Sequence, residues 1–303
     1  MNRREFILAS AAATGLAGCA SLSAKSNDRE GILFGACRPF GDAKLMKSIG
    51  YDFLECGAAA SFIPTKGGDD WKRQKEMLLS LPIPLRSCNG FIPGTFRLTG
   101  PKADFAPALD YAETILRRAE EVGTKTIVFG SGGARNVPGD FTAKDRKLQP
   151  NLEKGTSQYT EFCRQLCKRV ADLKTVSIVI EPLRPNESNI VNFVWQGVQI
   201  CNDVGSPRLQ QLADIFHMMM GRETADSIRL AGGMLKHCHI ASYGTRQFPG
   251  SDPATVERLR PYFAALKDIG YTGGVSCECG WGAKGDLAKN LEIALKTMKS
   301  LEA

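Results

Sequence analysis

Four ionisable residues in the second half of the chain each stand at or near the end of a short apolar run. They are Glu181 after VSIVI, Asp214 after LQQLA, His239 in LKHCHI and Glu278 after GGVSC. A buried, unpaired charge is costly, so a carboxylate such as Glu181 requires a cation, a metal or a proton there. Three carboxylates and one imidazole form a hard ligand set, which suits Mn²⁺, Mg²⁺ or Co²⁺ and also accepts Zn²⁺. The four residues are therefore candidate ligands of one divalent metal ion.

Each of these residues also has an ordinary structural explanation when it is taken alone. Asp214 is suited to cap a helix. His237 lies on the same strand face as His239, so one of the two histidines can be a core residue or a support behind the ligands. Glu278 has fewer alternatives because it lies between two cysteines in an apolar run. The recurrence of the pattern in strand order, rather than any single residue, favours a shared site.

The elements that must position these residues are short apolar runs that alternate with amphipathic stretches, as in parallel strands covered by helices. Eight runs are predicted to be strands: 32–37, 52–57, 85–91, 126–130, 176–181, 209–216, 235–241 and 274–278. The stretch 287–301 is predicted to be the last helix. Eight such units without a break in composition predict a (β/α)₈ TIM barrel, a single domain over residues 31–303. Barrels of this kind carry their chemistry at the C-terminal ends of the strands.

An open, doubly wound sheet is the competing fold. Its first strand-to-helix turn should carry a glycine fingerprint, which FGACR lacks. Gly132 and Gly133 are not followed by Lys-Ser or Lys-Thr, so a phosphate-binding loop is not expected. The stretch 131–151 is expected to be irregular and to overhang the barrel mouth.

The motifs EPLRPNE, DIFHM, HCHIAS and VSCECG, in this order, resemble the xylose isomerase-like TIM barrels. The resemblance is to their sugar phosphate isomerase/epimerase branch, which includes D-tagatose 3-epimerase-like enzymes, and it extends from about Gly31 to the C-terminus. It implies that Glu181, Asp214, His239 and Glu278 are metal ligands, with Mn²⁺ the expected ion.

The same resemblance implies a metal-dependent isomerase or epimerase of a sugar-like ketone. Glu187 and His217 match residues that hold substrate oxygens, and Arg246 matches an arginine of the family at a spacing one residue longer. Glu181 and Glu278 would face each other across the sugar, where one removes a proton to form an enediolate and the other returns it. A divalent ion would acidify the carbon that loses the proton.

Two other functions stay open. A lyase that removes water from a keto-polyol or keto-glycoside shares the proton abstraction and differs only in the fate of the enediolate. A non-catalytic, lipid-anchored sugar-binding protein would not need two opposed glutamates. An abasic-site endonuclease of the same superfamily is not expected, because its three metals need more histidines than His217, His237 and His239.

Further polar and aromatic residues are weaker candidates. Asn89 ends the third strand and could bind substrate hydroxyls, as could Glu55 at the end of the second, although either could equally be a satisfied polar residue of the rim. Trp281 follows the eighth strand closely and is expected to wall the pocket, and Trp195 is a second candidate for that role. Arg135 could bind an anionic group, but a surface salt bridge is the expected role.

The chain begins with MNRREFILASAAATGLAGCASLSA, which has a basic start, a short apolar core and small residues before a cysteine. This pattern predicts an export signal that is too short to span a membrane. Arg3-Arg4 resembles a twin-arginine signal, and LAGC resembles a lipobox whose Cys19 would carry the lipid. We therefore expect a signal peptide over residues 1–18, a tether over 19–30, and a periplasmic lipoprotein that meets the membrane only through this anchor.

Charge and cysteine content limit the partners. The net charge of +7 is a mild excess and indicates no nucleic-acid partner. The expected partner is a small-molecule sugar or sugar derivative, and an oligomer is compatible with the sequence. Of the ten cysteines, Cys19 is assigned to the lipobox, and the others are expected to be free, buried thiols.

Overall fold

A computed structural model describes residues 31–139, 149–283 and 286–303. Its eight strands pair in parallel and in chain order, and β8 closes the barrel on β1. They are Leu33–Cys37 (β1), Phe53–Gly57 (β2), Leu85–Asn89 (β3), Thr126–Phe129 (β4), Ser177–Ile180 (β5), Leu209–Asp214 (β6), Leu235–Ile240 (β7) and Gly274–Cys277 (β8). Each strand lies within the range expected from the sequence, and the predicted (β/α)₈ barrel is confirmed.

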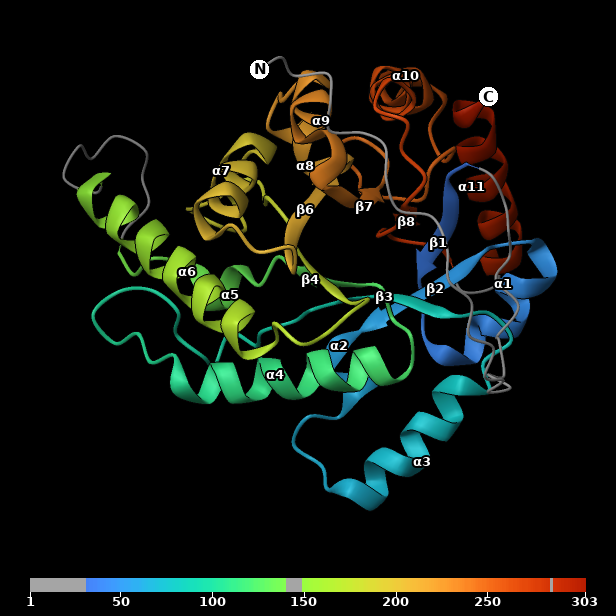
Figure 1. Cartoon of the computed structure of the whole chain (residues 1–303). Coiled ribbons are helices and arrows are strands. Elements are labelled where there is room, and N and C mark those ends of the chain that lie inside the picture. The colour runs from blue at the N-terminus through green and yellow to red at the C-terminus, as the bar shows by residue number, and fades with distance from the viewer. Residues whose placement is uncertain (1–30, 140–148, 284–285) are drawn as a thin grey trace, which may run out of the picture.

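Helices surround this sheet, and Figure 1 shows the last of them beside the first, where the ring closes. They are Ala43–Ile49 (α1), Ala58–Phe62 (α2), Gly68–Leu79 (α3), Ala106–Glu121 (α4), Gly132–Arg135 (α5), Gln149–Arg169 (α6), Val194–Val204 (α7), Ile215–Met220 (α8), Asp226–Ala231 (α9), Pro253–Asp268 (α10) and Leu287–Glu302 (α11). The predicted last helix is confirmed as α11. The expectation of an irregular stretch over 131–151 is wrong in part, because α5 follows β4 directly and α6 begins at Gln149.

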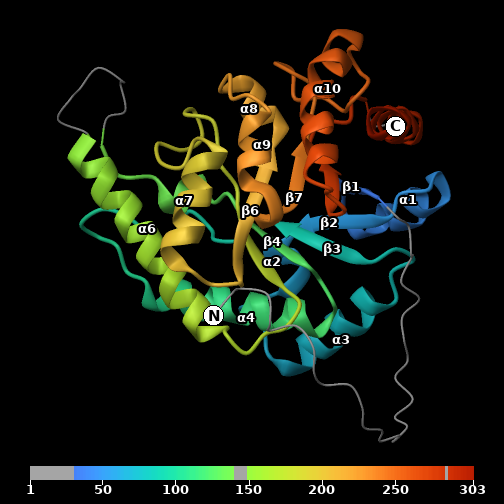
Figure 2. The same cartoon turned by 45° about the horizontal axis from the view of Figure 1, so that its top comes forward.

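Local sequence explains where the longer helices begin and what they bury. In α10, the side chain of Asp252 accepts a hydrogen bond from the backbone nitrogen of Ala254, and Pro253 occupies the first turn, where a missing N–H costs nothing. In α4, the stripe that includes Leu109, Ala112 and Leu116 is buried against the sheet side of the helix. Periodic apolar faces thus attach the covering helices. Figure 2 shows these helices arranged around the sheet.

The barrel interior has an apolar floor beneath a polar mouth. Val128, Val179 and Leu212 form a small buried cluster that is separate from the main core between sheet and helices. Side chains alternate along a strand, so Glu181 shares a face with Val179 and Asp214 shares one with Leu212. In β5 and β6 the interior face therefore changes from apolar to acidic at the C-terminal end of the strand.

The described residues contain nine cysteines, and all nine are free thiols, as expected. Seven of them are buried as expected, whereas Cys37 and Cys279 are partly exposed. Among the helices of the described ranges, none is both long and apolar enough to cross a membrane. The predicted signal peptide, the tether and Cys19 lie outside the described residues.

Candidate active site

The four predicted ligands come together at the C-terminal ends of consecutive strands. Glu181 follows β5, Asp214 ends β6, His239 belongs to β7 and Glu278 follows β8. One candidate ligand atom from each residue lies within 4.8 Å of the others. Glu181, Asp214 and His239 are buried, and Glu278 is partly exposed. Four strands thus deliver three carboxylates and one imidazole to a single point.

The local backbone positions two of these carboxylates. Gly130 directly follows β4, and a side chain there would collide with the carboxylate of Glu181. Asp214 caps α8, because its Oδ1 accepts a hydrogen bond of 3.1 Å from the backbone nitrogen of His217. The cap and the candidate ligand are therefore the same residue, with Oδ1 used by the helix and Oδ2 directed toward the cluster.

His239 lies between two groups of carboxylates. Its Nδ1 is 3.1 Å from Glu181 Oε1 and 3.6 Å from Glu278 Oε2, and its Nε2 is 2.9 Å from Glu55 Oε1. Burial alone would lower the pKa of His239, but the negative charges of Glu55 and Glu278 and the hydrogen bonds that the ring donates to Glu181 and Glu55 raise it well above its ordinary value.

Arg246 supplies a positive charge to the acidic cluster. Its guanidinium lies 2.6 Å from Glu278 Oε2, 3.2 Å from Glu187 Oε1 and 3.9 Å from Asp214 Oδ2. Arg246 has a φ of 52°, which is uncommon for a residue with a side chain. Its backbone nitrogen bonds to the Ser242 carbonyl, and its own carbonyl accepts from the backbone nitrogen of Gly280. The loop after β7 is thus joined to the loop after β8.

The cluster shifts its carboxylates in opposite directions. Burial raises the pKa of Glu278, as do the neighbouring carboxylates of Glu181 and Asp214, against the opposing charges of His239 and Arg246. Burial would also raise the pKa of Asp214, but His217, His239 and Arg246 together lower it. Mutually repelling carboxylates held around one imidazole fit a divalent cation, because the ion would replace the imidazole proton as a counter-charge and add to the charge of the Arg246 guanidinium.

Two of the predicted substrate contacts lie beside this cluster. His217 Nε2 is 3.5 Å from Asp214 Oδ2 and 3.7 Å from Glu187 Oε2. Neither ring nitrogen of this buried histidine has a hydrogen-bond partner within the described residues. Glu187 is held by Arg184, whose Nε donates a hydrogen bond of 2.8 Å to Glu187 Oε1. An unpartnered buried imidazole next to two carboxylates is suited to bind a polar ligand.

Comparison with known proteins places this geometry in a family. The profile of the xylose isomerase-like TIM barrel family matches residues 43–301. The chain belongs to this family. A D-psicose 3-epimerase from Agrobacterium fabrum is 33% identical over 104 residues, which are 34% of this chain and 35% of that protein. The chain therefore matches about a third of the length of that relative.

Solved structures of the family share the fold. A D-psicose 3-epimerase from Clostridium cellulolyticum with D-tagatose superposes with a TM-score of 0.75 at 19% identity, over 89% of this chain and 99% of that one. A 3-keto-D-glucoside 4-epimerase from E. coli gives a TM-score of 0.70 at 20% identity, with the same coverage of both chains. At identities of about 20%, structural similarity establishes the barrel fold, and the substrate has to be inferred from the residues of the site.

Asn89, predicted to bind substrate, lies on the opposite side of Glu278 from Arg246. Its Nδ2 donates a hydrogen bond of 3.0 Å to Glu278 Oε1. Asn89 also lines a cavity of about 350 Å³ at the ends of β1, β2 and β3, together with Cys37, Arg38 and Phe40. Asn89 is therefore placed both to hold a candidate proton carrier and to meet a ligand in the cavity.

Glu55 and His237 have a larger part in the site than the sequence suggested. The carboxylate of Glu55 is fully buried, and its Oε2 lies 2.8 Å from His237 Nε2. The rim position considered for Glu55 is therefore wrong, because the residue lies behind His239 and its oxygens already face two imidazoles. The sequence did indicate that His237 and His239 share a strand face. It gave no indication that both rings contact Glu55 on β2.

The expected surface salt bridge of Arg135 is wrong. The side chain is fully buried, lies over the ring of Tyr159, and donates hydrogen bonds to Ser188 Oγ and to the carbonyl oxygens of Phe129 and Val191. The guanidinium thus binds only protein groups among the described residues. Arg135 joins the end of β4 to the loop after β5 and is a structural residue.

The two tryptophans have different positions. Trp281 is buried in the loop after β8 and stacks on Phe248 at 6.1 Å, with Arg38 over its ring, and its place in the pocket wall stays a prediction. Trp195 is 46% exposed and lines a groove between α6 and α7 on the outside of the barrel, so its predicted place in the pocket wall is wrong.

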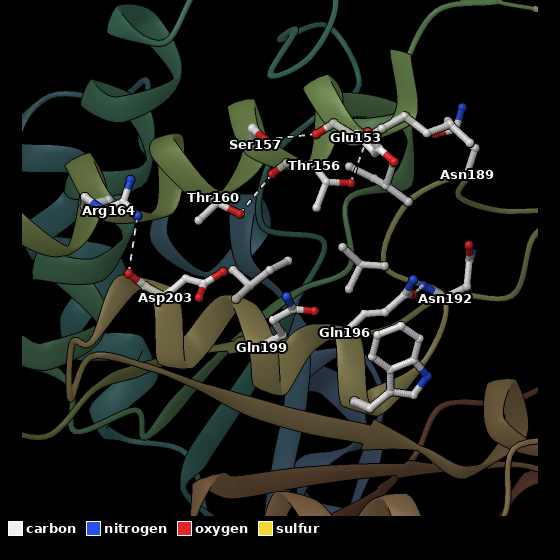
Figure 3. A pocket seen from close by; sticks show the side chains of 15 residues that line it. Glu153, Thr156, Ser157, Thr160, Arg164, Asn189, Asn192, Gln196, Gln199 and Asp203 are labelled. Carbon is white, nitrogen blue, oxygen red and sulfur yellow. Dashed lines mark hydrogen bonds between the residues drawn. The ribbon is translucent and has the colours of Figure 1, made fainter. Parts of the chain in front are cut away.

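This outer groove has a volume of about 870 Å³ and shares no residue with the four-residue cluster. Figure 3 shows polar side chains along it, several of which bond to their own helix or across to the neighbouring one. Thr160, for example, bonds to the Thr156 carbonyl, and Arg164 bonds to the Asp203 carbonyl. Size alone therefore does not make the groove the active site.

Proposed function

We propose that the chain is a divalent-metal-dependent epimerase of a sugar-like ketone, in which Glu181 and Glu278 transfer the proton. The observation that carries the proposal is their common approach to one imidazole nitrogen: His239 Nδ1 lies 3.1 Å from Glu181 Oε1 and 3.6 Å from Glu278 Oε2. The two glutamates follow strands that are not neighbours in the barrel. A substrate carbon between them could lose a proton on one face and regain one on the other.

Glu181, Asp214, His239 and Glu278 would hold the metal. When bound, a divalent ion acts as a Lewis acid that polarises a ketone and makes the neighbouring C–H more acidic. We expect Mn²⁺, although Mg²⁺, Co²⁺ and Zn²⁺ suit the same donor set.

The surrounding residues would orient the substrate and the proton carriers. His217 and Glu187 would bind substrate oxygens, since the His217 ring is buried without a hydrogen bond in the described part of the chain. Asn89 and Arg246 hold the two oxygens of Glu278 at 3.0 and 2.6 Å. Their donors would keep this carboxylate in one orientation during proton transfer.

The names of the relatives support a ketose or a keto-sugar as substrate, because they include D-psicose 3-epimerases and a 3-keto-D-glucoside 4-epimerase. The cavity of about 350 Å³ beside Asn89 leaves space for the end of a sugar that is distant from the reacting carbon.

Isotope exchange tests the proposal. The full chain, loaded with Mn²⁺, should incorporate deuterium from D₂O at one sugar carbon of a ketose or a 3-keto-glycoside and produce its epimer. Loss of water from the product instead of epimerisation would support the lyase. If the chain binds metal and sugar but exchanges no deuterium with either ketoses or 3-keto-glycosides, catalysis is refuted.

We also propose that the chain is exported and anchored through Cys19. The twin-arginine-like and lipobox-like motifs support this proposal. The enzyme would then act on sugars outside the cytoplasm.

A further inference from the structure

Glu55 is a buried carboxylate whose partners are two histidine rings. Its side chain has no exposed surface, its Oε1 lies 2.9 Å from His239 Nε2, and its Oε2 lies 2.8 Å from His237 Nε2. Within the described residues, no lysine or arginine forms an ion pair with it. Each oxygen of the carboxylate thus serves one imidazole.

This arrangement determines which nitrogen of His239 is available to a ligand. An ionised carboxylate can only accept hydrogen bonds, so the ring nitrogen that faces Glu55 carries a hydrogen. For His239 that nitrogen is Nε2, which leaves Nδ1 as the atom directed toward Glu181 and Glu278. A carboxylate that holds the outer nitrogen of a metal-binding histidine fixes both the tautomer and the orientation of the ring.

We propose that Glu55 is a positioning residue that holds His239 in the Nε2–H tautomer, with Nδ1 directed into the metal-binding cluster. The inference rests on the metal centre of the proposed function and not on the identity of the sugar. In this role the carboxylate acts through the imidazole of His239, to which its Oε1 is joined by the 2.9 Å hydrogen bond with Nε2.

His237 supports Glu55 from the side away from the cluster. Its ring meets Phe53 edge to face, with centroids 6.0 Å apart. A side chain at Gly274 would come within 3.1 Å of His237 Nδ1, so the ring is confined by the backbone of β8. Because His237 occupies Oε2, rotation of the Glu55 carboxylate away from His239 would break two hydrogen bonds.

One alternative arrangement uses some of the same atoms. Cys37, Glu55 and His239 also offer ligand atoms within 4.8 Å of one another. A second ion at that point would need His239 Nε2 without its hydrogen, which conflicts with its hydrogen bond to Glu55. The two arrangements differ in the number of ions bound per chain.

Mn²⁺ titration of the metal-free full chain in the absence of sugar, by calorimetry with metal analysis, tests the inference. Glu55→Ala should weaken Mn²⁺ binding about 10- to 100-fold. Glu55→Gln should weaken it less, because its amide oxygen can still accept from one imidazole. The absorption spectrum of the Co²⁺-loaded Glu55→Ala variant should also change, since reorientation of His239 alters the ligand field. Thr126→Val is the matched control, because it removes a buried side-chain hydrogen bond of 2.9 Å to Ser87 elsewhere in the barrel.

The inference is overturned if Glu55→Gln and Glu55→Ala bind Mn²⁺ as tightly as the wild type while remaining folded by thermal unfolding. If Glu55→Ala does not fold, Glu55→Gln and its Co²⁺ spectrum decide. Two ions per wild-type chain, reduced to one by Cys37→Ala, would also overturn it. Normal metal binding by the wild type without any epimerisation would refute the proposed function and leave the inference on Glu55 standing.

Discussion

Arg246 lies in direct contact with Glu278: a guanidinium nitrogen is 2.6 Å from the carboxylate oxygen Oε2. The two residues belong to the loops after β7 and β8, which are also joined by the backbone hydrogen bond between Gly280 and Arg246. The arginine therefore acts as a counter-charge for the carboxylates in the chain without metal.

Replacement of this counter-charge should affect the metal-free chain most. Arg246→Gln should lower the free energy of unfolding by about 1–3 kcal/mol with a chelator present, because buried carboxylates lose a charged hydrogen-bond donor. The loss should shrink in excess Mn²⁺, which would supply the positive charge instead. Thermal unfolding under both conditions measures the difference. Arg260→Gln, which breaks an exposed pair with Glu257, is the control. An equal loss with and without Mn²⁺ contradicts the interpretation.

Substitution of the two proposed proton carriers should reduce turnover much more than sugar binding. Glu278→Gln and Glu181→Gln should each lower turnover by roughly 10²- to 10⁴-fold, the usual contribution of general acid–base catalysis. Glu278→Gln should retain sugar affinity, measured by calorimetry with Mn²⁺ present. Glu113→Gln on α4 is a surface control. Unchanged turnover in Glu278→Gln would favour a sugar-binding protein.

Metal affinity should rise with pH. The pKa of His239 is raised in the metal-free chain, despite its burial, by the charges of Glu55 and Glu278. The imidazolium of His239 therefore stabilises the folded, metal-free chain at pH values below about 6.5, the pKa of histidine in the unfolded chain. This stabilisation is lost as the pH rises through the higher pKa of His239 in the folded chain. An ion that binds Nδ1 must displace this proton.

Calorimetric titration of Mn²⁺ at several pH values, in buffers of different ionisation enthalpy, should show tighter binding and less proton release as the pH increases. Affinity independent of pH over the neutral and alkaline range would show that His239 does not hold the proton that the metal displaces.

Arg135 should stabilise the fold in a way that lysine cannot replace. Arg135→Lys should reduce the free energy of unfolding by roughly 2–4 kcal/mol, because one ammonium cannot reach three acceptors in different directions and so loses buried hydrogen bonds that the guanidinium makes. Val191, one of those acceptors, has a φ of 56°, so this loop depends on outside support. Urea denaturation measures the loss, and a lysine variant as stable as the wild type would contradict it.

Lipid attachment can be tested at one atom. Cys19→Ser should move the protein from the membrane fraction to the soluble periplasmic fraction, because the lipidated thiol would be missing. Fractionation of cells that express the full chain measures this shift, with Cys37→Ser as a control that leaves the lipobox intact. An unchanged distribution argues against the anchor.

The strand pattern was readable because burial on both faces makes parallel strands appear as short apolar runs. The same runs located Glu181, Asp214, His239 and Glu278, since a barrel brings the C-terminal ends of its strands to one mouth. Arg135 was misjudged because the hydrophilicity of an arginine does not reveal that its acceptors, at the end of β4 and in the loop after β5, are buried around it. Trp195 was misjudged because α7 turns it to the outer surface.

The sequence by itself therefore determined the barrel and its acidic mouth, because both follow from periodic patterns that are local along the chain. Only the tertiary structure decided the partners of those residues. The contact of Glu55 with His237 and His239 joins β2 to β7, and strands that are not neighbours meet only through side chains that cross the barrel interior. Such contacts depend on register and strand tilt, which no local pattern encodes.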